Sequence, residues 1–477
     1  MRKLLIKNGF VASVDPTIGN IANGDVLISG DRIEEVGRDL EVTDAEIVDA
    51  TDCIVMPGFV DAHKHIWQGA AVRAYCTDWS LDDYVNYIRL NVAAAFGAED
   101  MYAVQLHGAF EAMNAGVTTA ADYCHNIHSP DHAHEAIRGL QDSGMRVVWN
   151  YGFNYPPLEN PVFKTFDDRV AFGRDVAKTH FSSKDQLLTL GIAPEELQHA
   201  LDNDTLSGQF NLARELGAHI FWHCNSKKPL GIRIPRGVAR VHDLGLLGDD
   251  ILFVHMSATE EDEWKMVADC GASVVFTPDT ELQMGMMWPS GDIAKRYGIT
   301  QSYGTDITSN NSADMFTALR LGLQTTRCRV IDREDLLGSG VPFTCEEALR
   351  WGTIDGAKAL GLESAVGSLT PGKKADLVFL NTKSLSLVGW DRSNVAGTII
   401  LQGQTADVDS VMVNGRFVKR HGKMVGDVAR VCELLEAARA RISETIEQWG
   451  GRVLNEGESD RRMAAMRSSE SGTFARG

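Results

Sequence analysis

Eight short apolar runs, separated by helix-like segments, occupy the middle of the chain between residues 58 and 364. Runs this short, bounded by turn residues, are typical of buried strands rather than helices. Because the runs alternate with helical patterns, eight such units in about 300 residues predict a closed, TIM-like (β/α)8 barrel of parallel strands. The expected strands are residues 58–61, 116–120, 146–149, 187–191, 218–222, 251–254, 272–276 and 300–304.

The two ends of the chain have a different pattern. Residues 1–57 and 365–425 contain short segments in which apolar and polar residues alternate, as in strands with one buried face. Strands from both ends can form one domain only if the middle folds as an inserted unit. The predicted architecture is therefore α/β: a barrel at 58–364 and a small β-sandwich from both chain ends. Beyond it, residues 426–477 are expected to form an amphipathic helix, over 426–449, and a mobile tail.

The charge balance argues against several classes of partner. Lys and Arg number 46 against 65 Asp and Glu, which gives a formal net charge of −19. Such a surface repels phosphate backbones and anionic lipid, so neither nucleic acid nor membrane is expected as the main partner. The eight cysteines show no paired spacing, which indicates reduced thiols and a cytoplasmic location. We expect a small-molecule substrate and a homo-oligomer, either a dimer or a tetramer.

Histidine and aspartate side chains fall at the predicted ends of four strands. The first strand leads into His63 and His65, which point to one side because strand side chains alternate. The fifth strand ends in His223, the sixth in His255 and the eighth in Asp306, at the positions where barrel enzymes place catalytic groups. A single histidine at a strand end usually has a structural role. Histidine and aspartate side chains at four strand ends together indicate a metal site. Three imidazoles and a carboxylate suit a divalent ion such as zinc, with a coordination position left for water.

Several segments resemble one family of hydrolases. Residues 56–65, Met-Pro-Gly-Phe-Val-Asp-Ala-His-Lys-His, resemble the first-strand signature of the amidohydrolase superfamily. Residues 304–306, 309–311 and 314–316 are similar to the last-strand signature of its cytosine deaminase and chlorohydrolase-type, triazine hydrolase-like branch. Residues 367–377 and 413–415 resemble the segments in which the chain of that family passes from the barrel back into the β-sandwich. The similarity covers about residues 3–422.

The resemblance implies specific roles for the strand-end residues. The implied metal ligands are His63, His65, His223 and Asp306. His255 would act as an acid/base that polarises the oxyanion, and Asp306 would also take a proton from metal-bound water. Relatives with two metals bridge them with a modified lysine at the fourth strand, and residues 187–194 contain no lysine. One divalent ion is therefore expected, with zinc first and iron or manganese as alternatives.

The chain departs from the branch at two positions. A glutamate usually follows the fifth-strand histidine by three residues, but residues 223–226 read His-Cys-Asn-Ser. After the seventh strand, Glu281 stands where an asparagine is usual. We hypothesise that Glu281, with Asp279 as the second candidate, supplies proton transfer or recognises a basic substrate group. The alternative is that Glu281 pairs with Arg233 or Arg236.

Other residues fall on loops at the same rim of the barrel. Aromatic and polar side chains there can stack on a flat heterocycle and read its edge, and the substrate-binding candidates are Gln68, His125 and Trp288. Lys227 and Lys228 could attract an anionic group, although a solvated loop is the simpler interpretation. The place of Lys64 is open: it lies outward among the helices or pairs with an acidic neighbour.

These observations predict a mononuclear, metal-dependent hydrolase that attacks a C–N or similar bond, by deamination or hydrolysis of a nitrogen heterocycle. Two alternatives remain open at this point. One is a metal-dependent decarboxylase on a related barrel, and the other is a non-catalytic barrel that binds ligands. Loss of the usual glutamate weighs against deamination in particular.

Overall fold

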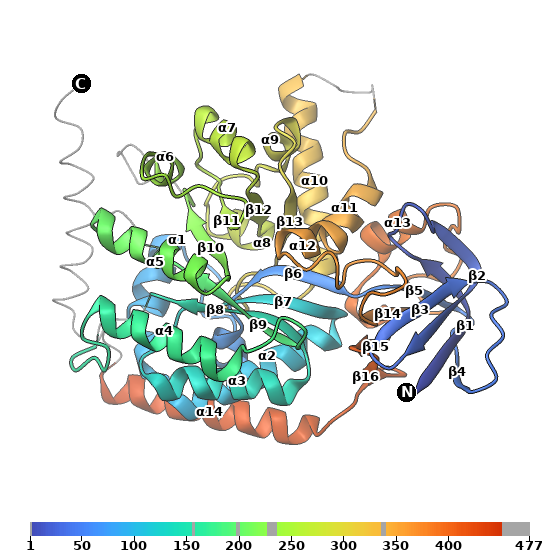
Figure 1. Ribbon diagram of the computed structural model, residues 1–477, viewed down its shortest axis with the longest axis horizontal. Helices are drawn as coiled ribbons and strands as arrows, with labels where there is room; N and C mark the ends of the chain where they lie inside the picture. The colour runs from blue at the N-terminus through green and yellow to red at the C-terminus, as the bar shows by residue number, and fades with distance from the viewer. Residues whose placement is uncertain (1, 155–157, 197–200, 227–235, 335–339, 451–477) are drawn as a thin grey trace.

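The computed structural model describes residues 2–154, 158–196, 201–226, 236–334 and 340–450. The middle of the chain forms a sheet of eight parallel strands in sequence order, which confirms the predicted barrel (Figure 1). Each of the eight predicted runs overlaps one of these strands. The strands are β6 (Phe59–Lys64), β7 (Val117–Cys124), β8 (Arg146–Gly152), β9 (Leu188–Ala193), β10 (His219–Cys224), β11 (Ile251–His255), β12 (Ser273–Phe276) and β13 (Gln301–Tyr303).

The barrel closes between its first strand and the segment after its last. The His65 amide donates to the Asp306 carbonyl at 2.8 Å, and the Asp306 amide donates to the His63 carbonyl at 2.9 Å. Gly304 makes this approach possible, because an added Cβ there would lie 2.5 Å from the His63 carbonyl oxygen. Closure therefore fixes His63, His65 and Asp306 relative to one another.

Helices follow each barrel strand, and several begin and end at residues that the sequence makes predictable. Helix α3 (Pro130–Ser143) has proline in its first turn and ends at Gly144, whose φ of 73° favours glycine. The other helices of this region are α1 (Leu81–Tyr84), α2 (Ala98–Asn114), α4 (Phe166–His180), α5 (Asn203–Glu215), α6 (Gly237–Asp243), α7 (Glu261–Cys270), α8 (Pro278–Gln283), α9 (Gly291–Arg296), α10 (Met315–Glu334), α11 (Cys345–Trp351) and α12 (Ile354–Ala359).

Irregular short helices fill the connection between β6 and α2. They are η1 (Ile66–Val72), η2 (Val85–Arg89) and η3 (Val92–Ala95). Tight and wide helical turns of this kind leave no regular apolar period, so the sequence gives little sign of how the segment packs. The segment nevertheless carries residues that reach the centre of the site.

The two chain ends form one mixed sheet of nine strands, the terminal sheet. Its strands are β1 (Lys3–Ala12), β2 (Asn20–Ser29), β3 (Arg32–Gly37), β4 (Ala45–Asp49), β5 (Cys53–Pro57), β14 (Leu377–Asn381), β15 (Val408–Val413), β16 (Arg416–Arg420) and β17 (Lys423–Met424). The pairing of β5 with β14 joins the two ends in antiparallel register. The expectation that the ends share a β domain is thus confirmed.

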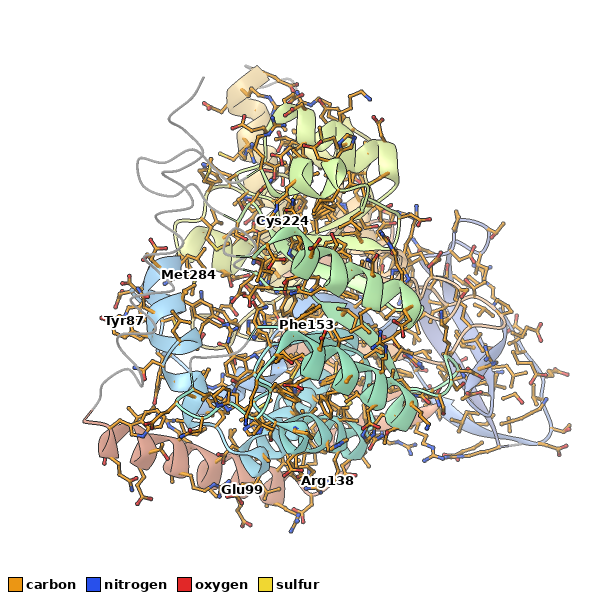
Figure 2. The ribbon with its side chains drawn as sticks, turned by 60° about the vertical axis from the view of Figure 1, so that its left-hand side comes forward. Tyr87, Glu99, Arg138, Phe153, Cys224 and Met284 are labelled. Atoms are coloured by element: carbon orange, nitrogen blue, oxygen red, sulfur yellow. The ribbon has the colours of Figure 1, made fainter. Side chains whose placement is uncertain are left out.

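The terminal sheet packs beside the starts of the first barrel strands. Arg146, the first residue of β8, makes a bidentate ion pair with Asp376, with distances of 2.8 and 3.1 Å. The Gly58 amide, just before β6, donates to the Asp376 carbonyl at 3.0 Å. The opposite, carboxyl ends of the strands are left for the site, and Figure 2 shows Tyr87 and Met284 on that side, away from the terminal sheet.

Helix α14 (Val428–Gln448) packs against α2 and runs along the lower edge of the molecule in Figure 1. The predicted tail, residues 451–477, lies outside the described residues. Across the described parts of the chain, every helix falls short of the length and apolarity that crossing a membrane requires.

Candidate metal centre and active site

Four side chains converge at the carboxyl ends of the barrel strands. His63 and His65 extend from β6, His223 from β10, and Asp306 follows β13. The Asp306 Oδ1 lies 3.3 Å from the Nε2 atoms of both His63 and His65. The His223 Nε2 lies 3.1 Å from the His63 Nε2. These ligand-type atoms therefore surround one point.

Two of the imidazoles are oriented from behind by oxygen atoms. The His65 Nδ1 contacts the Tyr123 carbonyl at 2.9 Å, and the His223 Nδ1 contacts the Glu196 carboxylate at 2.9 Å. Because a carbonyl or carboxylate oxygen only accepts, each Nδ1 carries the proton and each Nε2 presents its lone pair. This arrangement is the usual one behind histidines that bind metal.

The protonation states also suit a cation. Burial lowers the pKa of His63 well below its ordinary value and that of His223 to about 4, so both rings are neutral. Burial would raise the pKa of Asp306, but its close contacts with His63 and His65 hold it well below its usual range. Neutral imidazoles and an ionised carboxylate are the forms that ligate metals. The donor set thus fits a divalent ion.

The backbone at two of these positions is strained. His255 has a φ of 72° and Asp306 a φ of 61°, in the left-handed region that residues with a Cβ rarely adopt. Each such residue costs of order 1–3 kcal/mol and concentrates at functional sites. The strain is consistent with side chains that are aimed at a common point at the expense of stability.

His255 lies beside the metal-ligand group and contacts a second carboxylate. Its Nδ1 is 3.3 Å from the Glu281 Oε1 and 3.1 Å from the Thr277 Oγ1. The same Thr277 hydroxyl lies 3.4 Å from the Asp306 Oδ2. Burial opposes a charge on His255, but the hydrogen bond to Glu281 and the charges of Asp306 and Glu281 raise its pKa. His255 is therefore equipped to hold a proton inside the barrel.

Glu281 is buried in the first turn of α8. Its contacts show whether it lies beside the metal-ligand group or pairs with an arginine. Its Oε1 also accepts from the Thr277 amide at 2.9 Å, and burial raises its pKa. Arg236 pairs with Asp262 instead, so the alternative Glu281–Arg236 pair is wrong. Arg233 lies outside the described residues, as do Lys227 and Lys228.

The three substrate-binding candidates differ in their surroundings. Gln68 is buried, and its amide is held by the Tyr84 hydroxyl at 2.5 Å and the Ser309 hydroxyl at 3.0 Å. His125 is buried and stacks on His65, with ring centroids 4.2 Å apart. Trp288 is 48% exposed. Gln68 and His125 are thus inside the site region, and Trp288 is at the surface.

Lys64 is turned away from the two ligands that flank it. It is 1% exposed, and its Nζ donates to the Thr305 Oγ1 at 2.9 Å. Thr305 in turn donates to the Asp61 carboxylate at 2.5 Å, and its amide donates to the same carboxylate at 3.0 Å. These contacts tie β6 to the segment after β13 and so support the ligand geometry.

Two residues of the site were missed at the sequence level. Glu196 holds His223, and the Arg89 Nε contacts its Oε1 at 3.2 Å. Burial would raise the pKa of Glu196, but the charge of Arg89 and the His223 contact lower it to about 2. Glu196 lies three residues after β9, and a carboxylate just beyond the end of a barrel strand is the signal that identifies it. Arg89 gave no signal, because it lies in the irregular connection after β6.

Comparison with known sequences identifies a family and curated relatives. The profile described as the Amidohydrolase family matches residues 54–418. The chain is 25% identical to a 5'-deoxyadenosine deaminase of Methanobrevibacter smithii, over 93% of this chain and 98% of the relative. It is 28% identical to a 5-methylthioadenosine/S-adenosylhomocysteine deaminase of Symbiobacterium thermophilum, over 88% of this chain and 94% of the relative.

Solved structures with the same fold include zinc-bound hydrolases. An adenosine deaminase from Xanthomonas campestris with bound zinc has a TM-score of 0.81 at 23% identity, and the match covers 93% of this chain and 99% of that one. An atrazine chlorohydrolase from Arthrobacter aurescens complexed with zinc has a TM-score of 0.77 at 19% identity, with 91% and 100% covered. At these identities the likeness concerns the fold.

Proposed function

The chain belongs to the amidohydrolase family, and from that premise we propose that it is a metal-dependent hydrolase that removes an amino group from a nitrogen heterocycle. The observation that carries the proposal is the convergence of His63, His65, His223 and Asp306 beside His255. Its curated relatives are deaminases, and their named substrates are adenosine derivatives.

One zinc ion is the proposed cofactor. Its ligands would be His63, His65, His223 and Asp306. The zinc in two structural neighbours supports the choice of metal, and the lack of lysine in β9 supports a single ion. When bound, such an ion acidifies water and so supplies a nucleophile at neutral pH.

The chain's own residues would manage charge and protons. The Asp306 carboxylate, kept ionised by His63 and His65, accepts the proton of the attacking water. His255 lies beside His63 and Asp306, and a protonated His255 would stabilise the negative charge that develops on the substrate. The Thr277 hydroxyl lies between the His255 Nδ1 and the Asp306 Oδ2 and links these two groups.

Glu281 is the proposed replacement for the glutamate that residue 226 lacks. Its carboxylate at 3.3 Å from the His255 Nδ1 keeps that imidazole protonated and oriented. The proton that Asp306 takes from the attacking water would replace the one that His255 delivers to the leaving nitrogen, and Glu281 would stay a carboxylate throughout. In this account Glu281 acts through His255 and is a positioning residue.

Roles in substrate binding are proposed for the three candidates at the rim of the barrel. His125 faces the substrate beside the metal ligands, and Trp288 covers it from the surface. Gln68 acts by holding the Tyr84 hydroxyl.

Ammonia release tests the proposed function. Zinc-loaded protein is incubated with aminopurines, aminopyrimidines, aminopterins and aminotriazines, and wild type is compared with the Asp306→Asn variant. We expect ammonia from at least one class and loss of at least about 10³-fold in the variant. Carbon dioxide without ammonia would favour a decarboxylase, and a protein that binds these compounds without turnover would be a binding barrel.

A further inference from the structure

Three buried hydrogen-bond donors lie together at the edge of the metal-ligand group. They belong to His125, Arg89 and Tyr84, which come from the end of β7 and from the connection after β6. His125 and Arg89 approach the same Glu196 carboxylate, at 4.0 Å from the His125 Nε2 and 3.2 Å from the Arg89 Nε. His125 also stacks on His65, with ring centroids 4.2 Å apart, so the cluster lies beside the metal-ligand group.

The tautomer of His125 follows from its neighbour. The Trp67 indole nitrogen lies 2.9 Å from the His125 Nδ1. An indole N–H can only donate, so the Nδ1 must accept and the ring proton must sit on Nε2. Within the described residues, this Nε2–H has no hydrogen-bond acceptor, although His125 is fully buried. A buried donor without an acceptor is costly unless a ligand supplies one.

Arg89 presents a second unused donor. Its guanidinium is buried, and one side is committed to Glu196 and to the face of Trp67, 5.9 Å from the ring centroid. The Nη1 has no acceptor in the described part of the chain. Arginine has no acceptor atoms of its own, so whatever meets Nη1 must carry a lone pair.

Tyr84 completes the set. Its oxygen receives the Gln68 amide hydrogen at 2.5 Å, which leaves the phenolic hydrogen to be donated. Burial raises the pKa of Tyr84 well above its ordinary value, so the hydroxyl keeps that hydrogen. Gln68 directly follows Trp67 in η1, and the Trp67 indole contacts His125, so the same short segment holds both Tyr84 and His125.

From these contacts we infer that His125, Arg89 and Tyr84 form a subsite for an oxygen that accepts hydrogen bonds and carries no hydrogen, namely a ring oxo or carboxylate oxygen of the substrate. The inference rests on the proposed function for the position of the substrate. It deepens that function, because it selects amino-heterocycles that also bear an oxo or carboxylate group over those that bear only amino groups.

Matched ligand pairs test this subsite by binding as well as by turnover. The pairs are cytosine against 2,4-diaminopyrimidine and guanine against 2,6-diaminopurine, with adenosine as a third kind of ligand whose oxygens are mainly hydroxyls. Affinities for zinc-loaded protein are measured by isothermal titration calorimetry, and ammonia release is followed in parallel. We expect at least one oxo compound to bind about tenfold or more tightly than its diamino partner.

Variants separate the subsite from general damage to the fold. His125→Phe removes the Nε2 donor, and Arg89→Lys keeps the charge beside Glu196 but removes the second nitrogen. We expect both to abolish the oxo preference. His125→Gln supplies an amide N–H donor and an oxygen that can accept from Trp67. This variant should therefore keep much of the oxo preference. His107→Gln, on α2, is the matched control and should leave the preference unchanged.

The outcomes distinguish the subsite from the proposed function. An oxo preference that depends on His125, with no ammonia released, supports the subsite and removes the deaminase proposal. Equal binding of both members of each pair, no binding of any, or a preference that survives in His125→Phe overturns the subsite. Adenosine binding that depends on His125 as strongly as oxo binding also overturns it, because the acceptor would then be a hydroxyl oxygen or a ring nitrogen and not an oxo oxygen.

Discussion

Glu281 places a carboxylate against His255, where an asparagine would leave the imidazole without a counter-charge. The contact at 3.3 Å and the raised pKa of His255 make a buried imidazolium available near neutral pH. Sequence could single out Glu281 because its residue type is unusual at that position. It could not show that the partner is His255, because the two residues lie 26 positions apart, at the end of β11 and in α8.

We predict that Glu281→Gln lowers kcat by about 10²-fold, because His255 loses its counter-ion. Without the carboxylate the pKa of His255 falls, so His255 loses its proton at a lower pH. The basic limb of the pH–rate profile should therefore move to lower pH. Glu261→Gln, an exposed glutamate on α7, is the matched control. Turnover and a basic limb that both match wild type would remove Glu281 from the mechanism.

Asp279 should make stability depend on pH. Burial, with a contribution from Asp314, raises its pKa from 3.8 to about 6. A raised carboxyl pKa means that the folded state binds the proton more tightly, so stability is lost as pH rises from 3.8 to about 6. Asp279→Asn should therefore stabilise the protein near neutral pH, by up to ~3 kcal/mol, and have little effect in acid.

Urea unfolding at about pH 4.5 and about pH 7 measures this difference. The gain in the Asp279→Asn variant should be larger at the higher pH, whereas Asp78→Asn, on the surface, should show no such trend. An equal change at both pH values would mean that Asp279 does not titrate between them.

At the scale of the elements, the barrel strands were predictable and the connection after β6 was not. Each barrel strand is an apolar run, so composition and turn residues locate it. The segment from η1 to η3 has irregular turns, and the way these turns fold decides which of its side chains reach the site. Arg89 and Tyr84 could therefore not be identified as site residues from the sequence, although the histidines at the strand ends could. The single hydrogen-bonded sheet of both chain ends was foreseeable from alternation, but not the strand order within it.

Gly304 sets how closely β6 and β13 approach. A Cβ at this position would lie 2.5 Å from the His63 carbonyl oxygen and 2.7 Å from its amide nitrogen. Gly304→Ala should therefore displace His63, destabilise the fold by roughly 1–3 kcal/mol and lower zinc content. Thermal unfolding and elemental analysis measure the two effects.

Gly97→Ala is the matched control, because the nearest atom to a Cβ there is 3.4 Å away. That variant should keep its zinc. Full zinc content and an unchanged melting temperature in Gly304→Ala would show that closure tolerates a side chain and does not fix the ligands.

At the scale of the whole molecule, the terminal sheet and the barrel are joined by a buried ion pair. The Arg146 and Asp376 side chains are 6% and 3% exposed. Removing one partner of such a pair leaves a buried charge and costs about 3–5 kcal/mol, so Arg146→Met should lower the free energy of unfolding by that amount. The predicted homo-oligomer stays a prediction.

Arg174→Met is the matched control for this junction. Arg174 makes the same bidentate contact with Glu215, but the two side chains are 52% and 49% exposed. An exposed pair contributes about 0–1 kcal/mol, so this variant should unfold nearly as wild type does. Similar losses in both variants would mean that the buried pair has no special part in joining the two units.

Zinc per chain, measured by elemental analysis of purified protein, tests the metal centre most directly. Wild type should hold close to one equivalent, and His63→Ala, His223→Ala and Asp306→Ala should each hold far less while remaining folded. Glu281→Gln should keep its zinc. Wild type that binds no divalent metal after loading, or ligand variants that retain a full equivalent, would contradict the account.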